Sequence, residues 1–77
     1  MIIGIDRLKP GQSGVVRSVE GGRGIVAKLE AMGLRPGKVV TKVSSQFMAG
    51  PVTVAVDGRQ VAMGRGIAAR VMVEVGG

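Results

Sequence analysis

The most regular alternation of apolar and polar residues lies on either side of Asp57-Gly58 and predicts a β-hairpin. This dipeptide favours a two-residue type I′ turn, in which both residues adopt positive φ. If the chain turns there, Val54 lies opposite Val61, and the apolar residues of both strands share one face. The residues expected on that face are Val52, Val54, Val61 and Met63, and those on the other face are Thr53, Ala55, Gln60 and Ala62.

One segment has helical spacing instead, and we expect a helix over about residues 22–32. Gly33 suits the left-handed position that follows a helix, which would bring Leu34 back onto Leu29 of the last turn. Pro36 then prevents the helix from continuing. The apolar face of this helix consists of Ile25, Val26, Leu29 and Met32, whereas Lys28 and Glu30 point away from it.

Two Pro-Gly pairs, at residues 10–11 and 36–37, each predict a type II turn, because proline fixes φ and glycine accepts positive φ. A strand is expected after each turn, over residues 13–20 and 38–45. The second strand has no single apolar face, and the pattern leaves open which set points inward: Val39, Thr41 and Val43, or Val40 and Lys42. A helical turn near residues 67–70 precedes a last strand, in which one side consists of Val71, Val73 and Val75.

The composition fits one small, mainly β unit. The chain has 77 residues and 14 glycines, so we expect a single domain, residues 1–77, of short strands curled into a barrel or sandwich. No apolar run approaches the roughly 20 residues that a membrane span requires, and the first residues do not resemble a secretion signal. The expected location is therefore cytoplasmic.

An excess of basic residues favours an acidic partner. Eleven lysines and arginines against five acidic residues give a net charge of +6, which suits nucleic acid, anionic lipid headgroups or an acidic protein surface. Phe47 is the only aromatic residue of the chain. Because single strands of nucleic acid are generally bound by stacking on aromatic side chains, the composition weighs against such a surface.

The chain lacks the residues of most catalytic and metal sites. Without histidine or cysteine it cannot hold zinc, or iron through imidazole or thiolate, and it has no nucleophile paired with a histidine base. Its carboxylates are scattered, whereas hard cations need several oxygens together. The segment G-R-G-I-A-A at residues 64–69 fits a dinucleotide-binding pattern, but too few residues follow it for a βαβ unit. We expect no enzyme activity, no cofactor and no metal site.

Exposed basic residues are the candidate partner contacts. Four of them flank the two Pro-Gly turns and would cluster if both turns lie at one end of a barrel: Arg7, Lys9, Arg35 and Lys38. Arg35 and Lys38 are the first candidates, followed by Arg65 and by Met48, which is expected to be exposed. A generally solvated surface is the alternative explanation. A third is that Arg23, Arg35 or Arg65 reaches the phosphates of a partner's nucleotide as an arginine finger.

Several segments occur in an order that is typical of one protein family. The string L-K-P-G-Q-S-G at residues 8–14 opens a strand, and K-L-x-x-M-G-L-R-P-G at residues 28–37 spans the end of the helix. Gly50-Pro51 precedes a valine-rich strand, and the stretch from Val61 to Glu74 follows it. This colinear set covers nearly the whole chain and resembles the ferrous iron transport protein A (FeoA) family.

The resemblance implies an SH3-like β-barrel of five or so strands, with one inserted helix and a short helical turn before the last strand. Members of this family assist the large membrane permease for ferrous iron, ferrous iron transport protein B. The implied partner is the cytoplasmic GTP-binding region of that permease, which this chain would dock on and modulate. The chain would then be peripheral to the membrane only through the permease.

Two other functions stay open. One is a basic barrel that binds nucleic acid, which the charge supports and the scarcity of aromatic residues opposes, so no nucleic acid is expected. The other is a stand-alone metal-responsive regulatory module, because a similar domain forms the C-terminal part of iron-dependent repressors and a fold does not determine a function. That role would need metal ligands or a repressor partner, and the sequence offers no ligand set.

Overall fold

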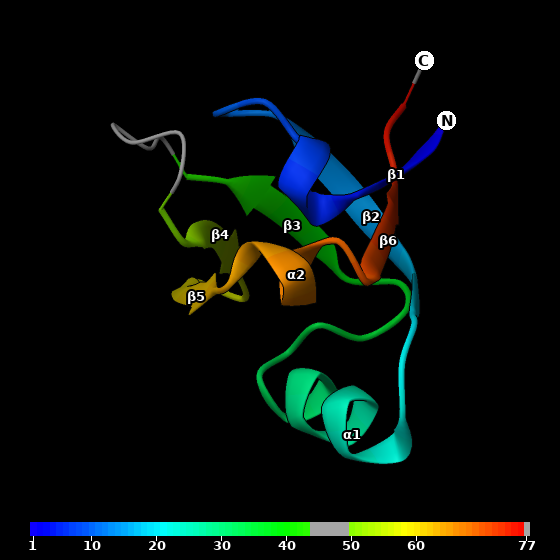
Figure 1. The fold of residues 1–77 in the computed structure, drawn as a ribbon. Coiled ribbons are helices and arrows are strands. Elements are labelled where there is room, and N and C mark those ends of the chain that lie inside the picture. Colours follow the sequence, from blue (N-terminus) through cyan, green and yellow to red (C-terminus); the bar gives the residue numbers. More distant parts are fainter. Residues whose placement is uncertain (44–49, 77) are drawn as a thin grey trace.

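The computed structural model describes residues 1–43 and 50–76, which form one antiparallel sheet with two α-helices and a 3-10 helix (Figure 1). The strands are β1 (Ile2–Gly4), β2 (Ser13–Val19), β3 (Val39–Lys42), β4 (Val52–Val56), β5 (Arg59–Met63) and β6 (Val71–Glu74). The helices are the 3-10 helix η1 (Ile5–Arg7), α1 (Arg23–Ala31) and α2 (Arg65–Ala68). The strand order is β1-β6-β2-β3-β4-β5. Neither described α-helix approaches the length and apolar character of a membrane-spanning segment.

The hairpin at Asp57-Gly58 is confirmed in both turn and register. Asp57 has a φ of 53° and Gly58 a φ of 75°, as a type I′ turn requires. Strand β4 pairs with β5 so that Val54 lies opposite Val61. On the expected inner face, Val52, Val54 and Met63 are buried and Val61 is half-buried.

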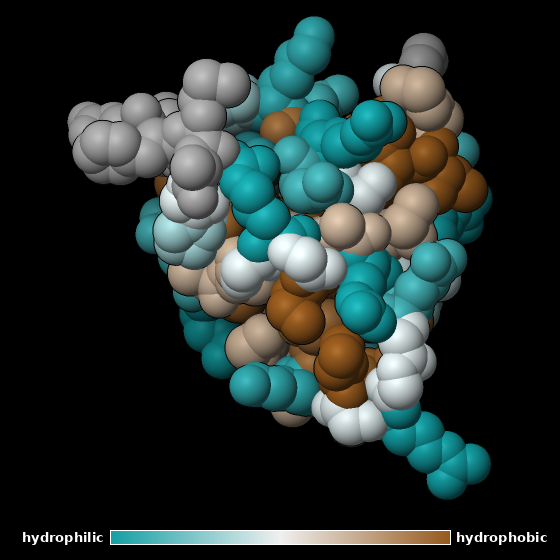
Figure 2. All heavy atoms as spheres, viewed as in Figure 1, coloured by the Kyte–Doolittle hydropathy of each residue, from teal (hydrophilic) through white to brown (hydrophobic). Residues whose placement is uncertain are grey.

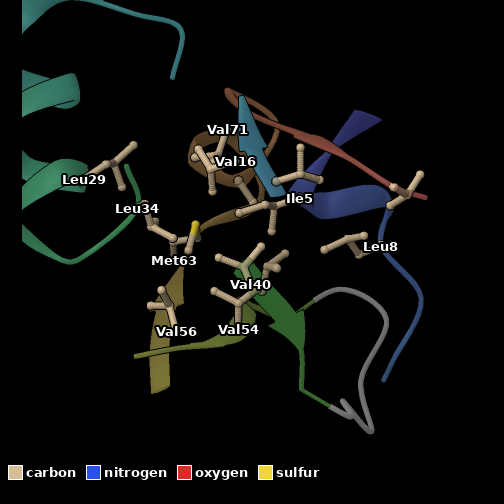
Figure 3. Close-up of a cluster of buried hydrophobic side chains, with 14 residues drawn as sticks. Ile5, Leu8, Val16, Leu29, Leu34, Val40, Val54, Val56, Met63 and Val71 are labelled. Atoms are coloured by element: carbon tan, nitrogen blue, oxygen red, sulfur yellow. The ribbon is translucent and has the colours of Figure 1, made fainter. Parts of the chain in front are cut away.

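Helix α1 falls inside the predicted segment and ends as expected at Gly33. Gly33 has a φ of +97°, and its N–H donates to the carbonyl of Glu30 at 3.0 Å. The N–H of Leu34 donates to the carbonyl of Leu29 at 3.0 Å. This pair of bonds defines a Schellman motif. It turns the chain back, so that Leu29 and Leu34 both lie in the core (Figure 3).

Valine dominates the core, which lies between the sheet, η1 and α2 (Figure 3). Its fully buried members are Ile5, Val16, Leu34, Val40, Val54, Ala68, Val71 and Val73. In β3 it is Val40 and Lys42 that point inward, which settles the choice the pattern left open. Lys42 is only 9% exposed, and its Nζ donates to the carbonyl of Leu8 at 3.0 Å. Its aliphatic stem thus lines the core while the ammonium group keeps a polar partner.

Strand β1 was not expected from the sequence. It pairs with β6, with Ile3 opposite Val73, and the N–H of Val75 donates to the carbonyl of Met1 at 2.9 Å. The sheet therefore has six strands where the sequence predicts five or so. The ends of the described chain lie side by side, as Figure 1 shows.

The remaining predicted elements are present with shifted bounds. Strand β2 ends one residue early, and β3 begins one residue late and stops at Lys42; residues 44–45 of the predicted strand lie outside the described residues. The helical turn before the last strand begins at Arg65 instead of residue 67. Both Pro-Gly turns form, since Gln12 N–H donates to the Lys9 carbonyl at 2.9 Å and Lys38 N–H to the Arg35 carbonyl at 3.1 Å.

Candidate docking groove

An apolar groove lies between α1 and the segment that joins β5 to α2. It has a volume of about 340 Å³. Figure 2 shows apolar side chains gathered at the surface between α1 and α2, with hydrophilic side chains on either side. The groove is lined by Ile25, Lys28, Leu29, Met32, Ala62, Met63, Gly64 and Ile67.

The groove exists because α1 covers its side of the barrel incompletely. The sequence places the whole apolar face of the helix on the core, but only Leu29 is buried. Ile25 and Met32 stay half-buried and face the groove together with Ile67 of α2. Met32 and Met63 supply flexible, polarisable surface that adapts to ligands of different shape. A partner's apolar side chain would complete the packing of this face.

Positive charge surrounds the groove. Lys28 lines it, and Arg65 directly follows Gly64 of its wall. Arg70 lies against Gly21 beside Ile25. Its Nη1 is 3.2 Å from the point where a Cβ would stand if Gly21 carried a side chain. Arg59 lies beside Gly33, which follows Met32 of the groove wall; a Cβ on Gly33 would stand 3.8 Å from Arg59 Nη2 and 3.6 Å from Asp57 Oδ2. The four cations near the groove are thus Lys28, Arg59, Arg65 and Arg70. None of them forms a salt bridge with another described residue.

Arg35 and Lys38, the first predicted contacts, lie close together at the tip of the β4–β5 hairpin. The Nζ of Lys38 is 3.2 Å from Oδ2 and 3.3 Å from Oδ1 of Asp57, so Lys38 is paired within the chain. The Nε of exposed Arg35 donates to the carbonyl of Glu30 at the end of α1, at 3.2 Å. Both cations therefore mark the corner where the hairpin meets the helix.

Arg65, the third candidate, is exposed as the first residue of α2. Strand β5 separates it from the corner formed by Arg35 and Lys38, because Arg65 follows the far end of that strand. Met48, the fourth candidate, lies outside the described residues. The structure thus brings two of the candidates together and places a third beside the groove.

The condition for clustering of the basic residues around the two Pro-Gly turns is not met, because the turns do not share one end of the barrel. The N–H of Gly11 donates at 2.8 Å to the carbonyl of Lys42, the last residue of β3. Gly37 lies just before β3, and its N–H donates at 2.7 Å to the carbonyl of Val16 in β2. The two turns therefore lie at opposite ends of β3, because antiparallel pairing with β2 directs them apart. Arg7 and Lys9 stay with the first turn only.

The carboxylates of the described residues are dispersed, and the glycine-rich segment forms a short helix. In residues 1–43 and 50–76, no three carboxylates lie close enough together to hold a metal ion. Glu74 pairs instead with Arg17, as Asp57 does with Lys38. The glycine-rich segment at residues 64–69 contains the four-residue helix α2, which packs next to η1 and is followed directly by β6.

Sequence reasoning did not identify the groove, and the missed residues are Ala62, Gly64 and Ile67. Each has an ordinary explanation on its own, as a strand, turn or helix residue. One signal in the sequence is consistent with a groove: the small residues Ala62 and Gly64 lie at and just after the end of β5, whereas the residues of α1 that face them are large and apolar. This difference in size leaves space between them. That signal depends on the arrangement of α1 and β5, which are separated by more than 25 residues in the chain.

Comparison with known proteins places the chain in a family. Residues 3–75 match the FeoA domain. The putative Fe(2+) transport protein A of Methanocaldococcus jannaschii is 33% identical over 66 residues, 86% of this chain and 78% of that protein. A crystal structure described as iron uptake regulatory protein (FeoA) superposes with a TM-score of 0.85 at 36% identity, covering 96% of both chains. T. acidophilum IdeR has a TM-score of 0.84 at 29% identity, and the likeness covers 97% of this chain but 34% of that one. The chain belongs to the FeoA family.

Proposed function

We propose that this chain is a non-catalytic accessory protein of ferrous iron uptake, which docks in the cytoplasm on the GTP-binding region of the ferrous iron permease and modulates it. The observation that supports docking most directly is the partly open apolar groove, with four cations near it that form no salt bridge within residues 1–43 and 50–76. Such a surface, with an apolar centre and a polar rim, is typical of protein interfaces. The names of the M. jannaschii relative and of the superposed structure support the link to iron uptake.

A charge placed inside the groove tests this role. Ile25→Glu puts a carboxylate on the half-buried groove face of α1 and keeps a good helix former. Ala27→Glu makes the same charge change on the exposed side of the same helix and is the matched control. Binding of the purified chain to the isolated GTP-binding region is measured by calorimetry, once with GDP and once with a non-hydrolysable GTP analogue.

The expected result is saturable binding by the native chain and by Ala27→Glu, with at least about tenfold weaker binding by Ile25→Glu, because the partner would have to desolvate the new charge. A difference between the two nucleotides would support modulation of the GTP-binding switch. Equal affinity of both variants would remove the groove from the interface. Absence of binding by the native chain would contradict the proposed role.

Nucleic-acid binding is the second candidate, since the charge of +6 and the four cations without a salt bridge to a described residue suit phosphate. A gel shift with duplex DNA at about 50 mM and 200 mM salt tests it. Binding driven by phosphate contacts should collapse at the higher salt concentration. Salt-sensitive binding to DNA, together with no binding to the GTP-binding region, would make this the leading function.

A further inference from the structure

Strand β5 has a free edge. It is last in the strand order, and among the described residues it pairs with β4 alone. In a hairpin with a two-residue turn, the two residues that flank the turn form a hydrogen-bonded pair, in which each N–H donates to the other residue's carbonyl. Moving away from the turn, hydrogen-bonded pairs then alternate with pairs that form no hydrogen bond to each other. Here Val56 and Arg59 flank the turn, so Val61 and Met63 also direct their peptide groups toward β4. The N–H and C=O groups of Gln60 and Ala62 therefore point away from the sheet.

These four groups are available to a partner. No backbone hydrogen bond joins Gln60 or Ala62 to a described residue outside β4, and both residues are exposed. They are two residues apart, about 7 Å along the strand, which is the spacing of the matching groups on an added strand. Ala62 also lines the apolar groove, so the free edge opens directly onto it.

An extended segment fits this surface better than a helix does. A helix uses its backbone groups internally, so an apolar helix laid over the edge would cover the polar groups of Gln60 and Ala62 without pairing them. An added strand pairs with them and turns every second side chain to the same face of the sheet. On the face shared with Met63, those side chains would enter the groove beneath Ile25 and Met32 of α1.

Charge selects among extended segments. Lys28 lines the groove, Arg59 and Arg65 lie at the two ends of β5, and none forms a salt bridge with a described carboxylate. A segment with carboxylates between its apolar residues is attracted to these cations, and a basic one is repelled. The same cations, with Arg70, oppose pairing of this edge with the same edge of a second copy.

We propose that β5 and the groove bind an extended acidic segment of the partner by strand addition, with alternate apolar side chains of that segment in the groove. This rests on the proposed function for the identity of the partner, but the recognition chemistry is tested without it. The occupant is an acidic, alternating peptide segment of another protein.

A proline at the free edge is the sharpest variant. Ala62→Pro removes an N–H that faces the partner and leaves the bonds between β4 and β5 in place. The matched control is Ile2→Pro on β1, the opposite edge. There Met1 and Val75 exchange both backbone bonds, so the N–H of Ile2 also points outward, away from the groove. Circular dichroism verifies that both variants are folded.

The first probe is the synthetic peptide acetyl-Glu-Val-Glu-Val-Glu-Val-amide, with acetyl-Lys-Val-Lys-Val-Lys-Val-amide as its basic control. Amide hydrogen exchange of the native chain is followed by NMR with each peptide. We expect the acidic peptide to slow exchange at Gln60 and Ala62 at least about tenfold, because each amide gains a partner, and to leave Ile2 and Gly4 unchanged. Equal effects of both peptides, or no slowing, would overturn the proposal. Slowing that rises with protein concentration alone would also overturn it in favour of self-pairing.

The second probe is the GTP-binding region of the permease. Ala62→Pro is expected to bind it at least about tenfold more weakly than the native chain and Ile2→Pro do. If Ala62→Pro binds as the native chain does, strand addition is wrong while docking stands. If the native chain does not bind that region and the acidic peptide still protects Gln60 and Ala62, the proposed function fails and the strand-addition site stands.

Discussion

Leu34 anchors the end of α1, and truncating it to alanine should remove a large part of the stability of the fold. The side chain is fully buried, beside Leu29 in the core. Loss of three carbons at about 0.8 kcal/mol each gives a transfer term of about 2.4 kcal/mol. The cavity left behind raises the expected loss to about 3–5 kcal/mol. A domain of this size has a free energy of unfolding of about 4–12 kcal/mol, so the variant approaches the limit of folding.

The measurement is urea and thermal unfolding followed by circular dichroism, because the chain has no tryptophan or tyrosine for fluorescence. The midpoint temperature of Leu34→Ala should fall by about 12 °C or more. The control is Val39→Ala, an aliphatic truncation at a side chain that is 57% exposed, which should cost less than about 1 kcal/mol. If Leu34→Ala lowers the free energy of unfolding no more than Val39→Ala does, Leu34 does not anchor the end of α1 to the core.

Two further predictions concern the same corner of the molecule. Gly33→Ala should cost about 1 kcal/mol, because a Cβ there lies 3.6 Å from its nearest neighbours without a clash while the φ of +97° is strained for alanine. Gly33→Asn should cost less in the same unfolding assay, and equal losses would contradict this cause. Reversing both charges at Arg35 and Lys38 with glutamate should weaken binding to the GTP-binding region and change stability by no more than about 1 kcal/mol. Unchanged binding by the folded double variant would remove both residues from the interface.

The elements that the sequence predicts correctly are those set by local chemistry. Asp57-Gly58 specifies its turn through two adjacent residues, and the alternating valines on both sides then fix the register. Gly33 ends α1 for an equally local reason, since only the residues of the last turn and the two that follow take part. The family motif across residues 28–37 contains this same helix end, so the two lines of reasoning agree there.

The parts that the sequence does not predict depend on contacts between distant segments. Strand β1 has no alternation of its own, and it is a strand because Ile3 pairs with Val73, 70 positions later. The inward side of β3 is set by the carbonyl of Leu8, which gives buried Lys42 a hydrogen-bond partner. The groove depends on how far α1 stands from β5, a distance that no local pattern encodes. For the same reason the sequence alone does not tell whether the basic residues near the two turns lie together.

The position of β6 between β1 and β2 has a consequence for the order of folding during synthesis. This last strand lies between β1 and β2, the first two strands to be made. Both must wait for residues 71–74 before they gain that neighbour, whereas the bonds of the β4–β5 hairpin and of α1 are local and do not involve β6. The nascent chain therefore exposes Val16 and Ile5, which the native core buries, until β6 has been made. The aggregation-sensitive interval for these two side chains thus runs from their own synthesis to that of β6, which lasts seconds at ordinary rates of translation.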